Sequence, residues 1–491
     1  ERTRSSSSFI GIGIGIGIGI GIGRGRGCGR RVRPISGAGG RGFRYVARVL
    51  LERPLSDMER AFWLLDRGAR FNGVGVATVH GPGPLGEPLV RAALLRLQAQ
   101  HPFLRMRVVG DDHDLRFTEH GAGPLPLRVL TAAHWQPIVE DELNLRFADD
   151  TDHLTRLTLR RDPADPQRSE LFITHHHVIT DAFSNVFVVR DLLTHLAALL
   201  GPQAAPPVRS LPLLPPLPAL LPEEARGLGR LGQMSAFFSK YIRGQALRHA
   251  RKLPSEQPAP PEQRRNRLVQ RTLPPEPTRA LAQRARAAGA SVHGALCAAL
   301  LLATAEVAYA TELAAATPTT VGCFTALNLR EQLEPPVGES LGLYMSQVTT
   351  FHRIVPPPPL WQLACAVKEQ LRTTLASGEQ YLTMPLIGLF IPWGNRPGPR
   401  FIRRFDCGSP AALGVSNLAR PPIPHRYGPL TLVDLHLAVG VAMVGQLMGQ
   451  ATTWEDRLHL NLVFSEPLVS RARAERIIDG ALAHLVAATA A

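Results

Sequence analysis

Lysine is nearly absent from this sequence of 491 residues, and aromatic residues are few. Only three of the 55 basic residues are lysines, so the net charge of +15 comes almost wholly from arginine. Aromatic residues make up 6% of the chain, which leaves little material for the stacking surfaces on which bases are bound. Outside the N-terminal segment the arginines are also scattered instead of clustered. We therefore expect no nucleic acid among the partners of this protein.

Cysteine is also scarce, and its spacing excludes two common kinds of site. The five cysteines are odd in number and far apart, which fits neither a disulfide framework nor a zinc site. No HExxH pattern or paired-cysteine spacing occurs, so no metal site is predicted. This cysteine usage favours a reducing compartment, and we expect a cytoplasmic protein. The five are Cys28, Cys297, Cys323, Cys365 and Cys407.

The first part of the chain lacks the variety of a folded sequence. Residues 1–44 hold nine arginines and one acidic residue, and in the run from Phe9 to Gly29 glycine alternates first with isoleucine and then with arginine and cysteine. Glycine at every second position leaves the backbone with high entropy and no second apolar face, so we expect a disordered, low-complexity tail. The apolar run is too short and too rich in glycine for a membrane span, and no transmembrane segment is predicted. A signal peptide is the alternative, although no small-residue cleavage pattern follows.

From residue 45 onwards the composition is that of a folded protein with more than one domain. Hydrophobic residues make up 45% of the sequence and charged residues 19%, enough to bury a large core. A proline-rich stretch at 201–225 cannot form a helix or a central strand, and it predicts a linker between lobes at 45–200 and 226–491.

Helical and strand patterns alternate in the first lobe. Ser56 with Glu59 three residues later predicts a capping box and a helix. A second helix is expected from about Gly86 to Gln100, with a strand from Leu104 after Pro102 has ended it. The remaining predictions are strands at 153–161 and 170–179, the latter central because it is apolar on both faces, and a helix at 181–200.

The second lobe repeats this alternation, which predicts an α/β or α+β fold. The patterns predict a basic helix near 233–251, a strand at 267–273, helices at 278–290, 291–310 and 356–376, and a last strand and helix within 459–490.

Chemistry is most concentrated in "HHHVITDAFS" (175–184). His177 lies in the turn between the apolar strand and the next helix, where α/β proteins often place reactive groups. Asp181 is near enough to cap that helix or to hold the turn by pairing with a cation. Neighbouring residues of a strand point to opposite faces, so the three histidines are poorly placed to share one metal ion. The spacing suits one base and one anchor, although histidines that only end a buried strand are the alternative.

The segment "HHVITDA" (176–182) resembles the HHxxxDG motif of a known superfamily. Its members include nonribosomal peptide synthetase condensation domains, alcohol acyltransferases, and polyketide-associated acyltransferases of the phthiocerol dimycocerosyl transferase type. The resemblance continues in order across residues 45–490. The segments that carry it are "MERAFWLLDR" (58–67), "LLRLQAQHPFLRMRV" (94–108), "GASVHGALCAALLLA" (289–303), "ALNLREQLEPPVGESLGLY" (326–344) and "GVSNLA" (414–419).

The resemblance implies two chloramphenicol-acetyltransferase-like lobes that form a central tunnel. One end of such a tunnel admits an acyl thioester, on coenzyme A or on the phosphopantetheine of an acyl carrier protein, and the other end admits an alcohol. His177 would be the general base that takes the proton from the attacking hydroxyl, because imidazole titrates near neutrality. This chemistry needs no covalent intermediate and no cofactor.

The same resemblance assigns supporting roles to four other residues. Asp181 would be structural and paired with Arg330, whose guanidinium group can bind a carboxylate through two of its nitrogen atoms. A surface position for Arg330 is the alternative. His176 would support the end of the strand. Asn417 would line the tunnel or polarise the carbonyl, or else would only form a turn.

The sequence also departs from the family pattern. Ala182 stands where the motif has glycine, and Ala419 replaces the glycine of the related "SNLG" pattern. The DFGWG motif of the plant branch is absent, and no carrier or adenylation domain adjoins the lobes. We therefore expect a free-standing, ester-forming acyltransferase that is monomeric. An amide-forming condensation enzyme and a non-catalytic binding member of the fold are the alternatives.

We predict that residues 1–44 contribute to neither fold nor turnover, because alternating glycine cannot bury enough apolar area to offset its ordering entropy. A chain without them should keep the melting temperature and the rate of the full chain. A truncated protein that unfolds or loses its activity would contradict this view.

Overall fold

The computed structural model describes residues 51–490, except 112–113, 121–122, 133, 148–152, 227–233, 236–238, 240–249, 383–410 and 442–445. The predicted tail at 1–44 lies outside the described residues, as does most of the basic helix expected near 233–251. Cys28 and Cys407 lie outside them too.

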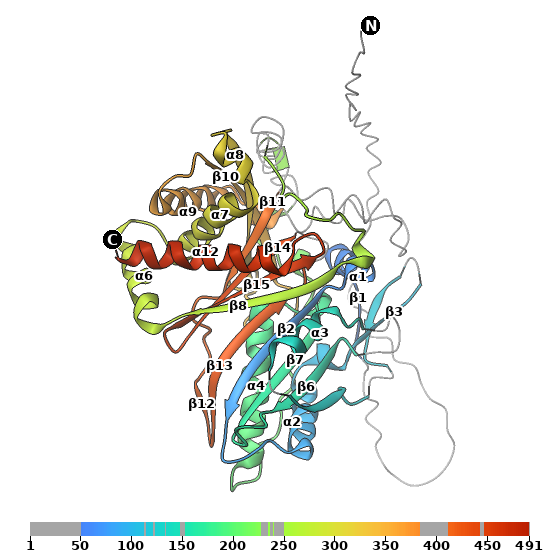
Figure 1. The fold of residues 1–491 in the computed structure, drawn as a ribbon. Coiled ribbons are helices and arrows are strands. Elements are labelled where there is room, and N and C mark those ends of the chain that lie inside the picture. The colour runs from blue at the N-terminus through green and yellow to red at the C-terminus, as the bar shows by residue number, and fades with distance from the viewer. Residues whose placement is uncertain are drawn as a thin grey trace, which may run out of the picture. The chain divides into compact units, whose positions relative to one another are not determined.

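The first half of the chain alternates strands and helices (Figure 1). Its elements are β1 (Glu52–Pro54), α1 (Asp57–Ala69), β2 (Asn72–His80), α2 (Glu87–Gln100), β3 (Arg107–Val109), β4 (Arg116–Thr118), β5 (Leu127–Thr131), α3 (Gln136–Asn144), β6 (Thr155–Arg161), β7 (Arg168–His176) and α4 (Ala182–Leu200).

The second half groups its helices and strands into longer runs, and α12 closes it (Figure 1). Its elements are β8 (Arg265–Leu273), α6 (Pro275–Ala287), α7 (Val292–Ala308), α8 (Ala310–Ala314), β9 (Thr319–Asn328), β10 (Met345–Val355), α9 (Leu360–Ala376), β11 (Ala411–Asn417), β12 (Arg426–Tyr427), β13 (Leu430–Val439), β14 (Leu447–Trp454), β15 (Arg457–Glu466) and α12 (Arg471–Ala490).

These strands form two six-stranded sheets, which confirms the predicted mixed α/β fold. The strand order is β12-β13-β2-β7-β6-β5 in one sheet and β10-β9-β11-β14-β15-β8 in the other. β12 and β13 come from the second half of the chain but complete the sheet of the first half, since β13 pairs with β2 along its length. A smaller sheet, β1-β4-β3, lies beside them. The chain therefore crosses between the sheets again long after the proline-rich stretch, and the division into lobes at 201–225 stays a prediction.

Two local sequence signals determine where α1 and α2 begin and end. Ser56 accepts a hydrogen bond from the Glu59 backbone, and the Glu59 side chain binds back to Ser56, so the predicted capping box is present. Pro102 ends α2 as expected, but residues Pro102–Arg105 form one 3-10 turn instead of starting a strand. The strand begins at Arg107, because the turn first buries Phe103 and Leu104 under the helix.

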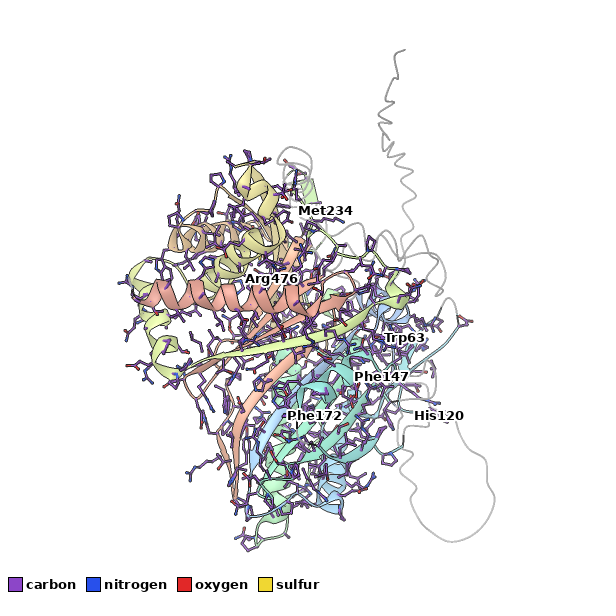
Figure 2. All side chains as sticks on the ribbon, in the orientation of Figure 1. Trp63, His120, Phe147, Phe172, Met234 and Arg476 are labelled. Carbon is purple, nitrogen blue, oxygen red and sulfur yellow. The ribbon has the colours of Figure 1, made fainter. Side chains whose placement is uncertain are left out.

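β7 is the central strand that its apolar sequence predicts. It pairs with β2 on one side and β6 on the other, and every residue from Ser169 to His176 is buried. Phe172, labelled in Figure 2, is fully buried on this strand and packs in a cluster with residues of α3 and β8. A buried strand of this kind holds the turn that follows it in a fixed place.

α4 follows that turn and packs against the sheet. The helix begins after Asp181, whose side chain accepts a hydrogen bond from the Ser184 backbone. Among the described residues it is the one single helix that is long and apolar enough to span a membrane; the pair α6 and α7 would qualify only as one span, and it bends by 102°. Most of the apolar surface of α4 is buried inside the protein, which is also the pattern of a core helix.

The proline-rich stretch is packed against the core. Leu217, Leu220 and Leu221 are buried in a cluster that contains Phe62 and Phe71. Because both phenylalanines contact the active-site region described below, this connection supports the site as well as joining the halves of the chain.

Candidate active site

His177 lies in the short turn between β7 and α4, as the sequence predicts. A 3-10 turn spans His177–Ile179, and the backbone N–H of His177 donates to the carbonyl of Phe71 at 3.1 Å. Its ring stacks on Phe71, with centroids 4.7 Å apart, and meets the edge of Phe62 at 5.0 Å. Two aromatic rings thus fix the orientation of this imidazole.

The three consecutive histidines have different partners. The Nδ1 atom of His175 hydrogen-bonds with Thr155 at 2.8 Å. The Nδ1 atom of His176 accepts from the Val178 backbone at 3.0 Å. Only His177 lines the cavity described below. The strand pleat separates their roles, as expected of neighbouring residues.

His176 anchors the turn through an aspartate that the sequence analysis did not find. Its Nε2 atom lies 3.5 Å from a carboxylate oxygen of Asp66, at the end of α1. Burial alone would raise the pKa of Asp66, but the nearby His176 ring lowers it below its usual range. The rings of Trp63 and Phe147, both labelled in Figure 2, lie 5.0 and 6.1 Å from the His176 ring. This packing gives His176 a supporting place, and no sequence signal pairs it with Asp66.

Burial controls the protonation of His177. It lowers the pKa of the ring to about 4, although backbone groups of His177 and Thr180 and the charge of Asp181 oppose this shift. The ring is therefore neutral at pH 7 and can accept a proton. Its Nδ1 atom is buried and makes no regular hydrogen bond with the described residues.

Asp181 and Arg330 form a buried ion pair, so Arg330 is not a surface residue. The Nη2 atom of Arg330 lies 3.0 Å from each carboxylate oxygen of Asp181, and their side chains are 4% and 5% exposed. The same carboxylate accepts hydrogen bonds from the backbone of Ser184 at 2.7 Å and of Tyr344 at 2.9 Å. The carboxylate of Asp181 thus connects the start of α4 to two places in the second half of the chain, the Arg330 side chain and the Tyr344 backbone.

The geometry of this pair differs from the expected two-nitrogen fork. Only Nη2 reaches Asp181, while Nη1 donates to the carbonyls of Gly338 at 3.1 Å and Ser340 at 2.8 Å. Nη2 also donates to the hydroxyl of Ser184 at 2.5 Å. Arg330 uses Nη1 and Nη2 for different partners, because it binds two backbone carbonyls as well as the Asp181 carboxylate.

A cavity of about 160 Å³ opens between the two sheets beside His177. One wall comes from β2 and β13, and the opposite wall from β9, β10, β11 and β14. Ala182, at the first position of α4, lines it as well. The apolar side chains of the walls include Val74, Leu327, Met345, Leu437 and Met448.

Asn417 lines the cavity and also forms a turn. Its Oδ1 atom accepts a hydrogen bond from the backbone of Ala419 at 2.9 Å. Ala419 has a φ of 53°, in the left-handed region that favours glycine. Ala419 of the "SNLA" segment therefore adopts a backbone conformation that glycine would adopt with less strain.

Asn185 is a second cavity residue that the sequence analysis missed. It lies one turn into α4, is buried, and its Oδ1 atom has no hydrogen-bond partner among the described residues. Its amide group lies so close to Gly75 of β2 that a Cβ there would stand 2.0 Å from Oδ1. Glycine at position 75 makes room for a polar group at the cavity wall, which only the tertiary structure reveals.

Similar solved structures define the class of the fold. The TRI3 trichothecene 15-O-acetyltransferase from Fusarium sporotrichioides matches at a TM-score of 0.71 and 13% identity, over 89% of this chain and 96% of that one. Polyketide synthase associated protein 5 from Mycobacterium tuberculosis matches at 0.63 and 15%, over 89% and 98%. The condensation domain of the Monacolin K polyketide synthase MokA matches at 0.60 and 12%, over 90% and 98%. The chain has the two-lobed fold that these acyltransferases and condensation domains share.

A family model matches part of the amino-acid sequence. Residues 262–464 match the model of the phthiocerol/phthiodiolone dimycocerosyl transferase C-terminus. No curated protein matches the sequence. The family match covers part of the second half of the chain, and the shared fold covers most of the chain, so both agree with the resemblance that the HHxxxD motif carries.

We expect Asp181→Ala to lower the free energy of unfolding by about 3–5 kcal/mol, because it leaves the Arg330 charge buried without its partner. Chemical denaturation measures this loss. The control is Glu369→Ala, which removes an exposed partner of Arg372 and should leave the stability nearly unchanged. Equal small effects of both substitutions would show that the buried pair does not hold the fold.

Stability should also fall between pH 7.5 and pH 5.5. Burial lowers the pKa of His175 to about 3 and those of His177 and His293 to about 4, from an ordinary 6.5. Between these pH values the three histidines become protonated in the unfolded chain but stay neutral in the folded chain. Each of them therefore lowers the free energy of unfolding by about 1.3 kcal/mol at pH 5.5 relative to pH 7.5. Urea unfolding at the two pH values checks the sign, and His293→Gln should reduce the difference. Equal stability at both values would contradict the buried neutral state.

Proposed function

We propose that this protein is an enzyme that moves an acyl group from a thioester to an alcohol. The donor is coenzyme A or an acyl carrier protein, and His177 is the general base. The observation that carries the proposal is the neutral imidazole of His177, held by Phe62 and Phe71 at the wall of a cavity between the two sheets. The fold of the solved acyltransferases supports it.

In the proposed reaction, the acceptor hydroxyl and the thioester carbonyl meet in the cavity. An imidazole nitrogen of His177 takes the hydroxyl proton as the oxygen attacks the carbonyl carbon. The tetrahedral intermediate then collapses, the carbon–sulfur bond breaks, and the protonated ring returns its proton to the leaving thiolate. The ester and the free thiol leave, and the ring is neutral again, so neither a covalent enzyme intermediate nor a cofactor is required.

The cavity walls favour an apolar acyl group. Aliphatic and thioether side chains dominate both walls, as is typical of pockets that bury hydrocarbon. The amide of Asn185 is the polar exception, and its free Oδ1 can accept a hydrogen bond from a donor on the bound substrate. Ala182 occupies space that glycine would leave open, which favours a slender donor arm over a bulky one.

Acceptors that carry either a hydroxyl or an amine distinguish ester formation from amide formation. The protein is incubated with a panel of acyl-coenzyme A and acyl-pantetheine thioesters, and free thiol is measured with alcohols or with amines. We expect thiol release that depends on an alcohol. Release with amines alone would identify an amide-forming enzyme, and no release with any pair would favour a binding protein.

Replacing His177 by alanine should lower turnover by about 10²- to 10⁴-fold, because the general base is lost. Its ring is packed between Phe62 and Phe71, so a modest loss of stability is also expected, and rates are therefore compared per folded molecule at a temperature well below melting.

His175→Gln is the matched control for this substitution. His175 is also buried and lies two residues away in the sequence, but it hydrogen-bonds with Thr155 and does not line the cavity. It should lose stability and retain the rate. Full activity of the His177→Ala enzyme would overturn the proposed mechanism.

A further inference from the structure

A second cluster of ionisable side chains lies where the two sheets meet. Asp434 and His436 are on β13, which belongs to the first sheet, and His459 is on β15, which belongs to the second. One ligand atom from each residue lies within 4.8 Å of the other two. The Nε2 atom of His459 is 2.7 Å from one oxygen of Asp434, and that of His436 is 3.4 Å from the other.

The cluster combines two buried imidazoles with a carboxylate that solvent can reach. His436 and His459 are almost fully buried, whereas the Asp434 side chain is 20% exposed and leaves a route from solvent. Imidazole nitrogen and carboxylate oxygen are both donors that divalent transition metals accept.

Hydrogen bonds satisfy this cluster in part, since the backbone N–H of Leu435 donates to Asp434 at 3.0 Å. Among the described residues, the ion pairs of Asp434 are with the two histidines and none is with an arginine or lysine. The Nε2 atom of His459 makes no regular hydrogen bond despite its short distance to the carboxylate, and the Nδ1 atom of His436 has no partner either. A carboxylate that is partly buried without a fixed cation is a costly arrangement, which a bound cation would relieve.

The surroundings hold both rings in place. The Nδ1 atom of His459 hydrogen-bonds with the hydroxyl of Thr272 at 3.0 Å, which leaves Nε2 toward Asp434. The ring of His436 stacks on Trp135, with centroids 4.7 Å apart. The orientation of His459 through its second nitrogen is characteristic of metal-binding histidines, whereas His436 is held by ring stacking. In a tetrahedral zinc site with bonds near 2.1 Å, ligand atoms lie about 3.4 Å apart, which matches the 3.4 Å between His436 and Asp434 and exceeds the 2.7 Å between His459 and Asp434.

We propose that Asp434, His436 and His459 bind a divalent transition-metal ion, with Zn²⁺ the best match. Two imidazoles select against Mg²⁺ and Ca²⁺, which prefer all-oxygen sites. The ion joins β13 to β15 and so ties the two sheets together, and water completes its coordination on the exposed side of Asp434. The role is structural, and the proposal does not depend on the reaction assigned to His177. Sequence spacing could not reveal the site, because its third ligand lies on a separate strand.

The test is metal binding by the full chain, without an affinity tag and after dialysis against a chelator. Isothermal titration with ZnCl₂ should show one equivalent bound, and Co²⁺ should give the visible absorption of a four-coordinate site. Zn²⁺ should also raise the melting temperature. MgCl₂ at the same concentration should do neither.

Asp434→Asn and His459→Gln should each weaken Zn²⁺ binding at least tenfold and abolish the rise in melting temperature. Asp434→Asn keeps the shape of a partly exposed side chain, so it tests the site even if His459→Gln fails to fold. The control His484→Gln removes an exposed histidine paired with Glu306 and should leave binding unchanged. A chain that binds no Zn²⁺, or binds it equally well as Asp434→Asn, would overturn the proposal.

Discussion

The buried carboxylate of Asp181 is the constraint on which the site depends. A charge removed from water must be compensated, and here Arg330, the start of α4 and the backbone of Tyr344 all supply donors to it. These donors come from segments far apart in the sequence, so the turn after β7 can take its position only when both halves of the chain are folded. The oxygens of Asp181 bind groups other than the imidazole, so Asp181 acts on His177 through the backbone of the turn and through its charge.

Around this anchor, the protein uses burial to set the state of its histidines. His177 stays neutral because aromatic rings exclude water from it, and His176 is held by Asp66. The cavity exists because β13 leaves the second half of the chain and joins the first sheet, so that both sheets contribute walls. Asn144 of α3 and Asn266 of β8 exchange two hydrogen bonds of 2.8 and 2.9 Å, which further hold the halves together. The same junction of sheets produces the Asp434 cluster.

Sequence signals predict the elements whose position depends on residues nearby in the chain. The capping box at Ser56, the cap at Asp181 and the apolar run of β7 depend on neighbours a few residues away, and each is found where expected. The pair of Asp181 and Arg330 followed from a family resemblance, because no rule of spacing joins residues so distant. Phe71, Asp66 and Asn185 reach the site through tertiary packing and carry no pattern of their own. The expected strand at Leu104 begins later because burial of that residue in a turn outweighs its strand propensity.

In the proposed reaction the thioester carbonyl lies next to His177, between the walls formed by β2 and β13 and by β9, β10, β11 and β14. A crystal structure with a non-hydrolysable amide analogue of an acyl-pantetheine thioester tests this most directly. We expect the analogue in the cavity, its acyl chain against the apolar walls and its carbonyl beside the imidazole of His177. An analogue bound elsewhere, or one whose carbonyl lies out of reach of His177, would contradict the account.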